Sequence, residues 1–427
     1  MVKKELKKIA KTLIGKSRIR QFLFNSKLKK IRKNHIKASN SLKGKRKIKV
    51  AFFLIHDSVW KYERLYNLLR EHPRFKPTVF VCPYIRAGNM VMQADMKKAF
   101  LAFKERGYDV KKTQKADGSW LDVKNEFKPD LVFFTNPHNL TRPEYLITNF
   151  LDTLTCYVPY NFGNSHLLNM FHNQDFHNYL WRLFTETLIH QKFSKLYARN
   201  KGENTLVTGF PGTDAFLIEN KSQSSSLWKS KNTIKIIWAP HHTIDDNKSF
   251  LSFSSFLVYY HYILFLLEKY SGKIEIAFKP HPLLKAKLYK HNDWGIEKTD
   301  RYYHKWNELE NGFLADGDYI DLFKTSDALI HDSGSFLIEY LYTEKPVLRT
   351  DVDDNVRDRI NEFGLMAYDV HYIAKSKKQV EGFIEKLIRG VDVKYEDRIR
   401  FKKKWLIPPG GNLASDNIMD FLKSELV

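Results

Sequence analysis

The sequence predicts an α/β protein with two domains, each built on a parallel sheet that helices cover on both faces. Three observations lead to this prediction. The chain has 427 residues, too many for one hydrophobic core. Short, nearly unbroken apolar runs alternate with amphipathic stretches, as expected for strands buried on both faces and the helices between them. The alternation restarts near residue 206, which indicates a second unit of similar size.

The first half of the pattern begins at residues 49–55, KVAFFLI, an apolar run that predicts a buried strand. An amphipathic helix is expected next, over residues 59–70. The same alternation predicts strands over 78–82, 130–135 and 155–159, a helix over 89–106, and a Phe- and His-rich helical stretch from about 167 to 189. Such alternation is typical of a doubly wound parallel sheet.

The second half predicts a similar sheet. Strands are expected over 204–208, 234–238, 274–278, 328–331 and 346–348, and helices over 253–269, 336–343 and about 415–426. We therefore divide the chain into a basic extension (1–47), an N-terminal Rossmann-like domain (48–205), a C-terminal Rossmann-like domain (206–407) and a C-terminal helix (408–427). Ligands of such sheets bind beyond the carboxyl ends of the strands, so we expect a site in a central cleft between the halves.

The positive charge is concentrated at the N-terminus. Of the net charge of +23, residues 1–47 carry +17, which leaves +6 for the rest. Apolar residues recur at helical spacing among the lysines of this extension, and Phe22, Leu23 and Phe24 add a short apolar patch. This pattern favours a helix that lies on an anionic membrane surface. A solvated arm and a nucleic-acid-binding arm are the alternatives, and the nearly neutral body argues against nucleic acid as a partner.

Cysteine content and hydropathy indicate the compartment. Cys82 and Cys156 both lie in or beside apolar runs, which is typical of reduced core positions. No run approaches the roughly 20 apolar residues that span a bilayer, and the N-terminal segment lacks the features of a secretion signal. We therefore expect a cytoplasmic protein bound peripherally to the inner face of the membrane.

The segment 326–349 contains the strongest sequence signal for a ligand site. Here an apolar strand runs into Asp332, Ser333, Gly334 and Ser335 and then directly into a helix. Free backbone N–H groups at a helix start and two hydroxyl groups favour a phosphate, and Gly334 allows close approach of the backbone. Ordinary helix capping by Asp332 and Ser333 is the alternative. Glu339, one turn further on, could accept hydrogen bonds from a ribose.

Two further strand ends in the second half contain histidines. Lys279 and His281 follow residues 274–278, and the flanking prolines restrict the backbone around the imidazole. A donating imidazole there could neutralise charge on a leaving diphosphate. Pro240, His241 and His242 follow residues 234–238. In an extended chain the two histidines point to opposite sides, so we expect at most one of them in the site. Paired metal-ligand motifs are missing from the sequence, and we predict no metal.

The N-terminal half offers several candidates for a general base at its strand ends. His56 and Asp57 follow the first strand, residues 136–138 (Asn-Pro-His) follow a later one, and His166 ends the loop 160–166. A histidine in hydrogen-bond reach of an acceptor hydroxyl could serve as the base. The residues do not select one of them.

The order of these segments resembles the CDP-glycerol glycerophosphotransferases, which build teichoic-acid-like polymers. The resemblance covers about residues 206–427. GFPGTD resembles the family's Gly-aromatic-Pro-x-x-Asp element, and WAPHHT resembles its strand followed by Ala-Pro-Thr. KPHP resembles its x-x-His-Pro element, and SDALIHDSGSFLIEYLYTEKPVL resembles its Asp-Tyr-Ser-Ser segment with the following helix and Lys-Pro strand. GGNLASDNIMDFL resembles its closing Asp-Gly-x-Ala-Ser helix.

The resemblance implies a GT-B fold whose C-terminal domain holds a CDP-activated donor, with no other cofactor. It implies that His281 and Ser335 contact the diphosphate and that Asp332 organises the turn. A hydroxyl of a lipid-linked polymer or glycan would attack the outer phosphorus of CDP-glycerol, or of a related alditol donor, and CMP would leave. Our own additions to this donor site are Lys279, Ser333, Gly334, Glu339, Pro240 and His241.

Two departures from the family pattern keep the donor and the base open. Family members carry a His-Gly pair in the N-terminal domain, where residues 157–163 here read YVPYNFG, and Gly334 replaces the first serine of the Ser-Ser pair. A GT-B glycosyltransferase of surface-polysaccharide synthesis is therefore the main alternative. A sugar-nucleotide 2-epimerase, which would act without an acceptor, is another.

Overall fold

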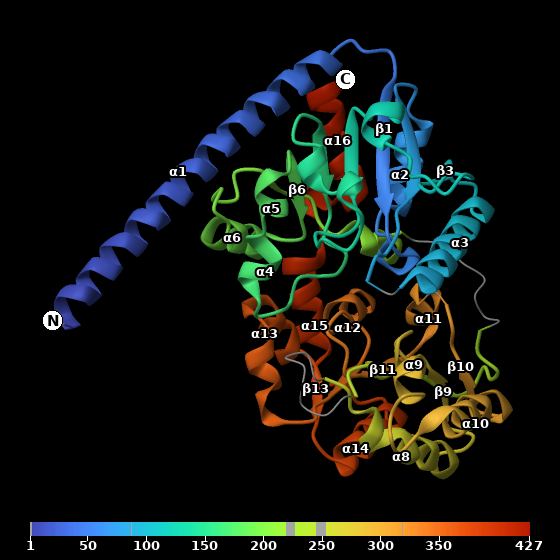
Figure 1. The fold of residues 1–427 in the computed structure, drawn as a ribbon. Helices are drawn as coiled ribbons and strands as arrows, with labels where there is room; N and C mark the ends of the chain where they lie inside the picture. The colour runs from blue at the N-terminus through green and yellow to red at the C-terminus, as the bar shows by residue number, and fades with distance from the viewer. Residues whose placement is uncertain (1, 87, 219–226, 245–252, 318) are drawn as a thin grey trace. The chain divides into compact units, whose positions relative to one another are not determined.

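The protein is described by a computed structural model that covers residues 2–86, 88–218, 227–244, 253–317 and 319–427, with side chains from residue 19 onwards (Figure 1). The chain forms two compact units. The N-terminal unit comprises residues 1–161, 168–212 and 412–427, and the C-terminal unit comprises 162–167 and 213–411. Both units are therefore discontinuous in sequence, which differs from the linear division expected above.

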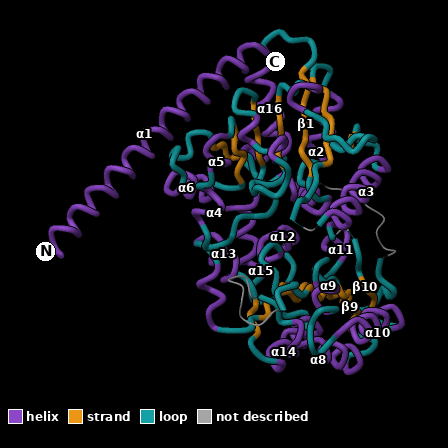
Figure 2. The backbone as a smooth tube through the Cα atoms, viewed as in Figure 1, coloured by secondary structure: helices purple, strands orange, loops and turns teal. Residues whose placement is uncertain are grey.

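The N-terminal unit contains a seven-stranded parallel sheet with helices on both faces (Figure 2). Residues of β1 alternate between two buried faces: Phe53 belongs to one aromatic cluster, while Phe52 packs against Tyr62 on the other. The strand order is β3 (Val110–Lys112), β2 (Phe75–Val81), β1 (Ile48–Leu54), β4 (Leu131–Phe134), β5 (Leu154–Tyr157), β6 (Arg182–Thr185), β7 (Thr205–Val207). Its helices are α1 (Val2–Leu42), α2 (Glu63–Glu71), α3 (Asn89–Glu105), α4 (Leu168–His172), α5 (Asp175–Tyr179), α6 (Leu188–Tyr197) and α16 (Ala414–Leu426).

The two terminal helices are part of this unit. The second half of α1 buries one stripe of side chains, including Phe24, Leu28 and Ile31, in the core that also contains Phe53. The spacing of three to four residues places these side chains on one helical face. Helix α16 buries a similar stripe, and the ion pair between Arg64 of α2 and Asp416 (2.8 Å) fixes its first turn.

The C-terminal unit contains a six-stranded parallel sheet whose core is largely aromatic. Trp238, Phe278 and Trp306 stack in its centre, with ring centroids 5.0 Å apart for the first two. The strand order is β10 (Gly312–Leu314), β9 (Ile274–Phe278), β8 (Ile234–Ala239), β11 (Ala328–His331), β12 (Val347–Thr350), β13 (Tyr372–Ala374). Its helices are α7 (Asp214–Leu217), α8 (Phe256–Lys269), α9 (Leu284–Leu288), α10 (Gly295–Glu308), α11 (Ile320–Thr325), α12 (Phe336–Glu339), α13 (Glu362–Asp369), α14 (Lys377–Ile388) and α15 (Tyr395–Phe401).

The structure corrects two expectations about the elements. The stretch 167–189 is not continuously helical, because β6 lies within it. The strand near residue 206, expected to open the second sheet, is β7, and it pairs with β6 at the edge of the first. The sequence shows that a segment is strand-like, but a three-residue strand contains too little pattern to reveal its partner.

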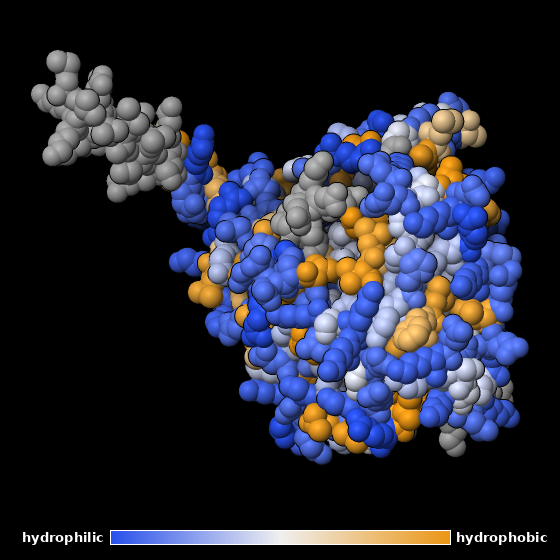
Figure 3. All heavy atoms as spheres, turned by 90° about the horizontal axis from the view of Figure 1, so that it is seen from below, coloured by the Kyte–Doolittle hydropathy of each residue, from blue (hydrophilic) through white to orange (hydrophobic). Residues whose placement is uncertain are grey.

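The described helices do not include one that is long and apolar enough to cross a bilayer. The face seen in Figure 3 is mostly hydrophilic, with hydrophobic residues in small separate groups. The exposed apolar residues include Phe22 and Leu23 of α1, which are 72% and 60% exposed.

Because α16 completes the N-terminal core, Leu422→Ala should lower the free energy of unfolding by about 2–5 kcal/mol, the usual cost of such a cavity. Leu422 is fully buried, whereas Val393 is 70% exposed. Val393→Ala is therefore the control, with an expected change within about 0.5 kcal/mol. Urea denaturation followed by tryptophan fluorescence measures both. Equal stabilities for the two variants would show that the helix is not part of the core.

Buried histidines make the fold sensitive to acid. Burial lowers the pKa of His172, His177 and His371 to about 3 in each case. Unfolding returns these groups to a pKa near 6.5, so below that pH the unfolded chain binds more protons and stability falls as pH falls. Asp332 opposes this trend, because burial raises its pKa to about 6, but it is one group against several.

Stability should therefore decrease between pH 6.5 and pH 5, by up to about 1.4 kcal/mol per pH unit for each buried histidine. Denaturant unfolding at several pH values measures the slope. His177→Gln should make the slope shallower, because it removes one of the buried imidazoles with a lowered pKa. A flat profile in this range would contradict the assignment of neutral, buried imidazoles.

Candidate functional site

The candidate site lies at the carboxyl ends of three neighbouring strands in the C-terminal unit. Strand β8 lies between β9 and β11, with Trp238 opposite Phe278 and Ala239 opposite His331. The three strands therefore end at the same level, and the segments that follow them begin side by side. The backbone N–H of His281 donates to the carbonyl of Pro240 (3.0 Å), which joins two of these segments directly.

Asp332 joins the third segment to the other two. Its carboxylate is fully buried and accepts hydrogen bonds from the backbone N–H of His241 (2.5 Å) and from both the N–H and the hydroxyl of Ser255, at the start of α8. Burial raises the pKa of Asp332 to about 6, while these donors favour the charged form. Through these hydrogen bonds the buried carboxylate links the end of β11 to the loop after β8 and to the start of α8.

Three half-buried histidines lie together above these strand ends. The ring centroids of His241 and His242 are 4.3 Å apart, and those of His242 and His281 are 4.2 Å apart. The expectation that at most one of the first two enters the site is thus wrong, because the chain bends at His242 and strand alternation does not apply there. Burial is the largest cause of the lowered pKa values of His281, about 3, and His241, about 2. Repulsion between the positive charges of neighbouring imidazoles is the next largest cause.

The turn after β11 has the small side chains that the sequence indicated. The amide of Asn164 donates to the carbonyl of Gly334, and the Arg349 guanidinium donates to the carbonyl of Ser333 (3.2 Å). Among the described residues, neither the Ser333 nor the Ser335 hydroxyl has a hydrogen-bond partner, so both can donate to a ligand. Helix α12 is only four residues long, so its dipole adds less than a long helix would.

Two predicted donor-site residues have roles within the protein. The Lys279 ammonium is 8% exposed and donates to the carbonyl of Gly317 (2.7 Å), which fixes a loop beside the site. Glu339 is 2% exposed and accepts a hydrogen bond from the Tyr319 hydroxyl. Its contact with a ribose stays a prediction, and the buried position places this carboxylate in the wall of the unit.

Four residues that the sequence did not suggest shape the site. Thr243, in the loop after β8, accepts the backbone N–H of Ser254, and the Ser255 hydroxyl donates to Asp332. Asn164 and Arg349 donate to the carbonyls of Gly334 and Ser333 in the turn after β11. Arg349 also forms a fully buried ion pair with Asp351 (2.9 Å). Ser255 and Asn164 contact Asp332 and Gly334, which are distant in sequence, and a lone serine or asparagine in a polar stretch gives no signal of its own.

The structure divides the acceptor-side candidates between the two units. His56 follows β1 in the N-terminal unit, where its ring contacts Tyr84 (4.7 Å between centroids) and burial lowers its pKa. Asp57 begins a 3-10 helix and accepts the N–H of Ser58 (2.9 Å). His166 differs from expectation: it belongs to the C-terminal unit, because Nδ1 and the backbone N–H both contact the carbonyl of Arg359.

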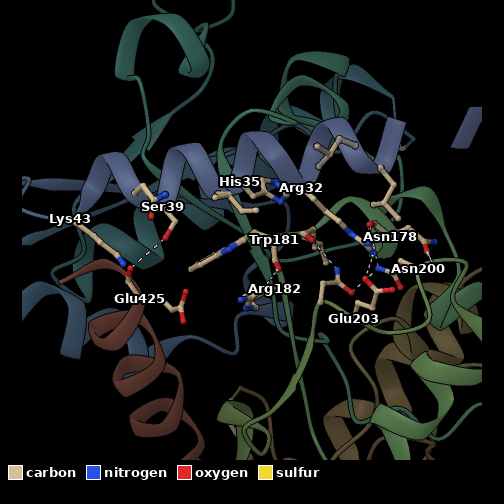
Figure 4. Close-up of a pocket in the computed structure, with 16 residues that line it drawn as sticks. Arg32, His35, Ser39, Lys43, Asn178, Trp181, Arg182, Asn200, Glu203 and Glu425 are labelled. Carbon is tan, nitrogen blue, oxygen red and sulfur yellow. Dashed lines mark hydrogen bonds and ion pairs between the residues drawn. The ribbon is translucent and has the colours of Figure 1, made fainter. Parts of the chain in front are cut away.

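A separate cavity of about 350 Å³ lies under the second half of α1 in the N-terminal unit (Figure 4). Arg32 lines it from α1, Arg182 from the start of β6, and Asn204 from the residue before β7. The cavity is therefore at the amino ends of these strands, opposite to the edge where ligands of doubly wound sheets bind. It is not part of the candidate site.

The sequence model of CDP-glycerol:poly(glycerophosphate) glycerophosphotransferases matches residues 160–422. No curated protein sequence matches the chain. Solved structures share the fold. A variant of the wall teichoic acid polymerase TagF aligns with a TM-score of 0.58 at 13% identity, over 96% of this chain and 98% of that one. A TagF variant soaked with CDPG gives 0.55 at 14% identity, over the same shares.

MnaA from S. aureus in complex with UDP aligns with a TM-score of 0.53 at 16% identity, over 89% of this chain and 97% of that one. These likenesses confirm the predicted GT-B class of two parallel-sheet α/β domains. The family match extends over more than half of the chain and includes all three strand-end segments of the site. The protein is therefore an enzyme that belongs to the CDP-glycerol:poly(glycerophosphate) glycerophosphotransferase family.

Proposed function

We propose that the enzyme transfers glycerol phosphate, or a related alditol phosphate, from a CDP-activated donor to a hydroxyl of a membrane-linked polymer or glycan. The observation that carries this proposal is the convergence of His281, His241 and the Ser333–Ser335 turn at adjacent strand ends within one unit. Hydroxyl and imidazole groups in one small region suit the diphosphate of a nucleotide donor.

The reaction is a displacement at the outer phosphorus of the donor. The acceptor oxygen forms a bond to this phosphorus, the bond to the bridging oxygen breaks, and the bridging oxygen leaves with CMP. Its hydroxyl proton passes to a base. Negative charge grows on the bridging and terminal oxygens, where the His281 imidazole and the Ser335 hydroxyl donate hydrogen bonds. Catalysis then depends on positioning and on charge stabilisation.

The base belongs to the acceptor side of the reaction. The family's His-Gly pair is missing at residues 157–163, so another group takes the proton. His56 is our candidate, because it ends the central strand β1 and its lowered pKa keeps the imidazole neutral and able to accept a proton. Asp57 follows it in the chain.

Helix α1 supports a peripheral position on the inner face of the cell membrane. Ile19, Phe22 and Leu23 are 61%, 72% and 60% exposed. Exposed cations such as Lys27 and Lys30 flank them. Apolar side chains among cations are the surface that anionic lipid headgroups bind. A lipid-linked acceptor would place the reaction at the same surface.

The donor-site proposal predicts that His281→Ala lowers turnover by about 100-fold or more, and Ser335→Ala by about 10-fold, as expected when a donor to the developing charge is removed. The assay is CMP release from CDP-glycerol in the presence of a poly(glycerol phosphate) oligomer. His304→Ala, at an exposed histidine of the same unit, should leave the rate unchanged.

Melting temperatures and circular dichroism would establish that each variant is folded. Wild-type rates for folded His281→Ala and Ser335→Ala variants would remove both residues from the site. Release of UDP from a sugar nucleotide, with no reaction of CDP-glycerol, would instead identify a glycosyltransferase, and turnover of a sugar nucleotide without any acceptor would identify an epimerase.

The membrane proposal predicts that the double substitution Phe22→Ser and Leu23→Ser weakens binding to phosphatidylglycerol vesicles by about 10-fold or more, because two apolar side chains no longer enter the interface. Cosedimentation measures the bound fraction. Val258→Ser, at a residue that is 53% exposed on α8, is the matched control. Equal binding of the wild type to phosphatidylcholine vesicles, or unchanged binding of the double variant, would contradict the proposal.

A further inference from the structure

The proposed reaction does not use the cavity under α1 in the N-terminal unit (Figure 4). Its volume of about 350 Å³ is at the lower end of the range for small-molecule sites. Most of the residues that line it are polar, and they come from α1, α5, α16 and the chain near the starts of β6 and β7. A ligand of this cavity should therefore be small and polar.

Two cations that line this cavity have no carboxylate partner among the residues that the structure describes. One guanidinium nitrogen of Arg182 donates to the carbonyl of Trp181 (3.0 Å), and the group lies over the rings of Trp181 and Phe421 (5.0 and 5.1 Å to the centroids). These contacts hold the guanidinium in place and leave its other N–H groups for a ligand. Lys43 follows α1, and its exposed ammonium can bind the same ligand. Such a pair is typical of phosphate sites.

His35 adds a hydrogen-bond acceptor to the cavity. Its side chain is 5% exposed, and Nε2 has no partner among the described residues. Burial, and then the charge of Arg182, lowers its pKa to about 4, so the ring is neutral at neutral pH. A backbone hydrogen bond with Thr153 acts in the opposite direction, as it does when a ring N–H donates to a carbonyl. The hydrogen of the neutral ring is thus used, and Nε2 can accept a hydroxyl.

An open groove of about 1030 Å³ continues from the cavity along α1. The cavity and the groove share Leu28, Arg32, Ile36, Asn200 and Glu203. Six cations and one carboxylate line the groove. The carboxylate is that of Glu203, which is already paired with Arg32 (2.6 Å). A row of cations beyond the cavity indicates a ligand with repeated negative charges.

Repeated charges and a hydroxyl acceptor favour an alditol phosphate polymer over a membrane surface. A lipid headgroup carries a single phosphate, whereas every unit of such a polymer carries a phosphate and a hydroxyl. Phe22 and Leu23, which we propose to enter the bilayer, line neither the cavity nor the groove. A bilayer is also too flat to follow a concave surface, which a flexible chain can do.

We propose that the cavity and the groove along α1 form a second, non-catalytic binding site for an alditol phosphate polymer. The phosphate of one unit binds Arg182 and Lys43, and its hydroxyl donates to Nε2 of His35. The phosphates of the next units bind the cations of the groove. The inference rests on the proposed function, in which this polymer is the acceptor and the product. A second site retains the polymer between successive transfers and raises its effective concentration at the enzyme.

The test is the binding of a fluorescent poly(glycerol phosphate) oligomer to the full-length protein, measured by fluorescence anisotropy. Arg182→Gln should weaken binding about 10- to 100-fold, the usual effect of losing a hydrogen bond to a charged group. Lys43→Glu, at an exposed residue, should weaken it about 10-fold through repulsion of the phosphate. Lys378→Glu makes the same change at an exposed residue of α14 and should bind as the wild type does.

The role of His35 has its own comparison. His35→Phe removes the acceptor of the hydroxyl, so it should weaken binding of the glycerol phosphate oligomer. Inorganic polyphosphate has the repeated charges without an alditol, and its binding should be unaffected. An equal effect on both ligands, or none on the oligomer, would show that His35 does not read the hydroxyl and would overturn this contact.

Wild-type affinity for the oligomer in the folded Arg182→Gln and Lys43→Glu variants would overturn the proposal. So would weaker binding of these variants to phosphatidylglycerol vesicles with oligomer binding retained, because the site would then hold a lipid headgroup. Single-stranded RNA that binds as tightly as the oligomer, and is equally sensitive to both substitutions, would show a general polyanion site instead.

The CMP-release assay separates this inference from the proposed function. With the polymer as acceptor, Arg182→Gln should raise KM about 10-fold or more and leave kcat unchanged, because the residue binds the acceptor away from the reaction. CMP release by variants whose oligomer binding is unaffected would refute the polymer site alone. Oligomer binding that depends on Arg182, without CMP release from CDP-glycerol, would refute the transferase alone.

Discussion

The carboxylate of Asp332 is the constraint on which the site depends. It is buried at the end of β11 and accepts hydrogen bonds from the loop after β8 and from the start of α8. A buried charge without these donors would cost several kcal/mol, so the loops must close around it. Their closure fixes the backbone at His241. In our proposal, the side chains that bind the donor are thereby positioned by a residue that does not itself contact it.

This arrangement separates positioning from ligand contact. Charged groups such as Asp332, Arg349 and Lys279 are buried and are engaged by backbone groups or by one another. In our proposal, neutral hydroxyls and imidazoles bind the donor. Neutral donors cost less to leave unoccupied in a half-buried site than charges do, and the surrounding cations supply the potential that attracts a phosphate. The site can therefore be preformed before the donor binds, which is the condition for electrostatic catalysis.

The sequence predicted the strand ends well, because β8, β9 and β11 are apolar runs that stop at polar residues. The fold class and the family followed from the order of these segments, whereas the roles of His281 and Asp332 stay predictions. Local pattern could not predict contacts between distant segments. Ser255 reaches Asp332 across 77 positions. His242 was excluded by assuming an extended chain, although the backbone bends there. Glu339 was expected near a ribose, and it is buried against Tyr319.

A crystal structure of the protein with CDP would test the central claim most directly, that strand-end donors of the C-terminal unit hold a nucleotide diphosphate. The account predicts phosphate oxygens within hydrogen-bond distance of Nε2 of His281 and the Ser335 hydroxyl, with the Asp332 contacts unchanged. A diphosphate bound elsewhere on the protein, with these two side chains left without contact to it, would contradict the account.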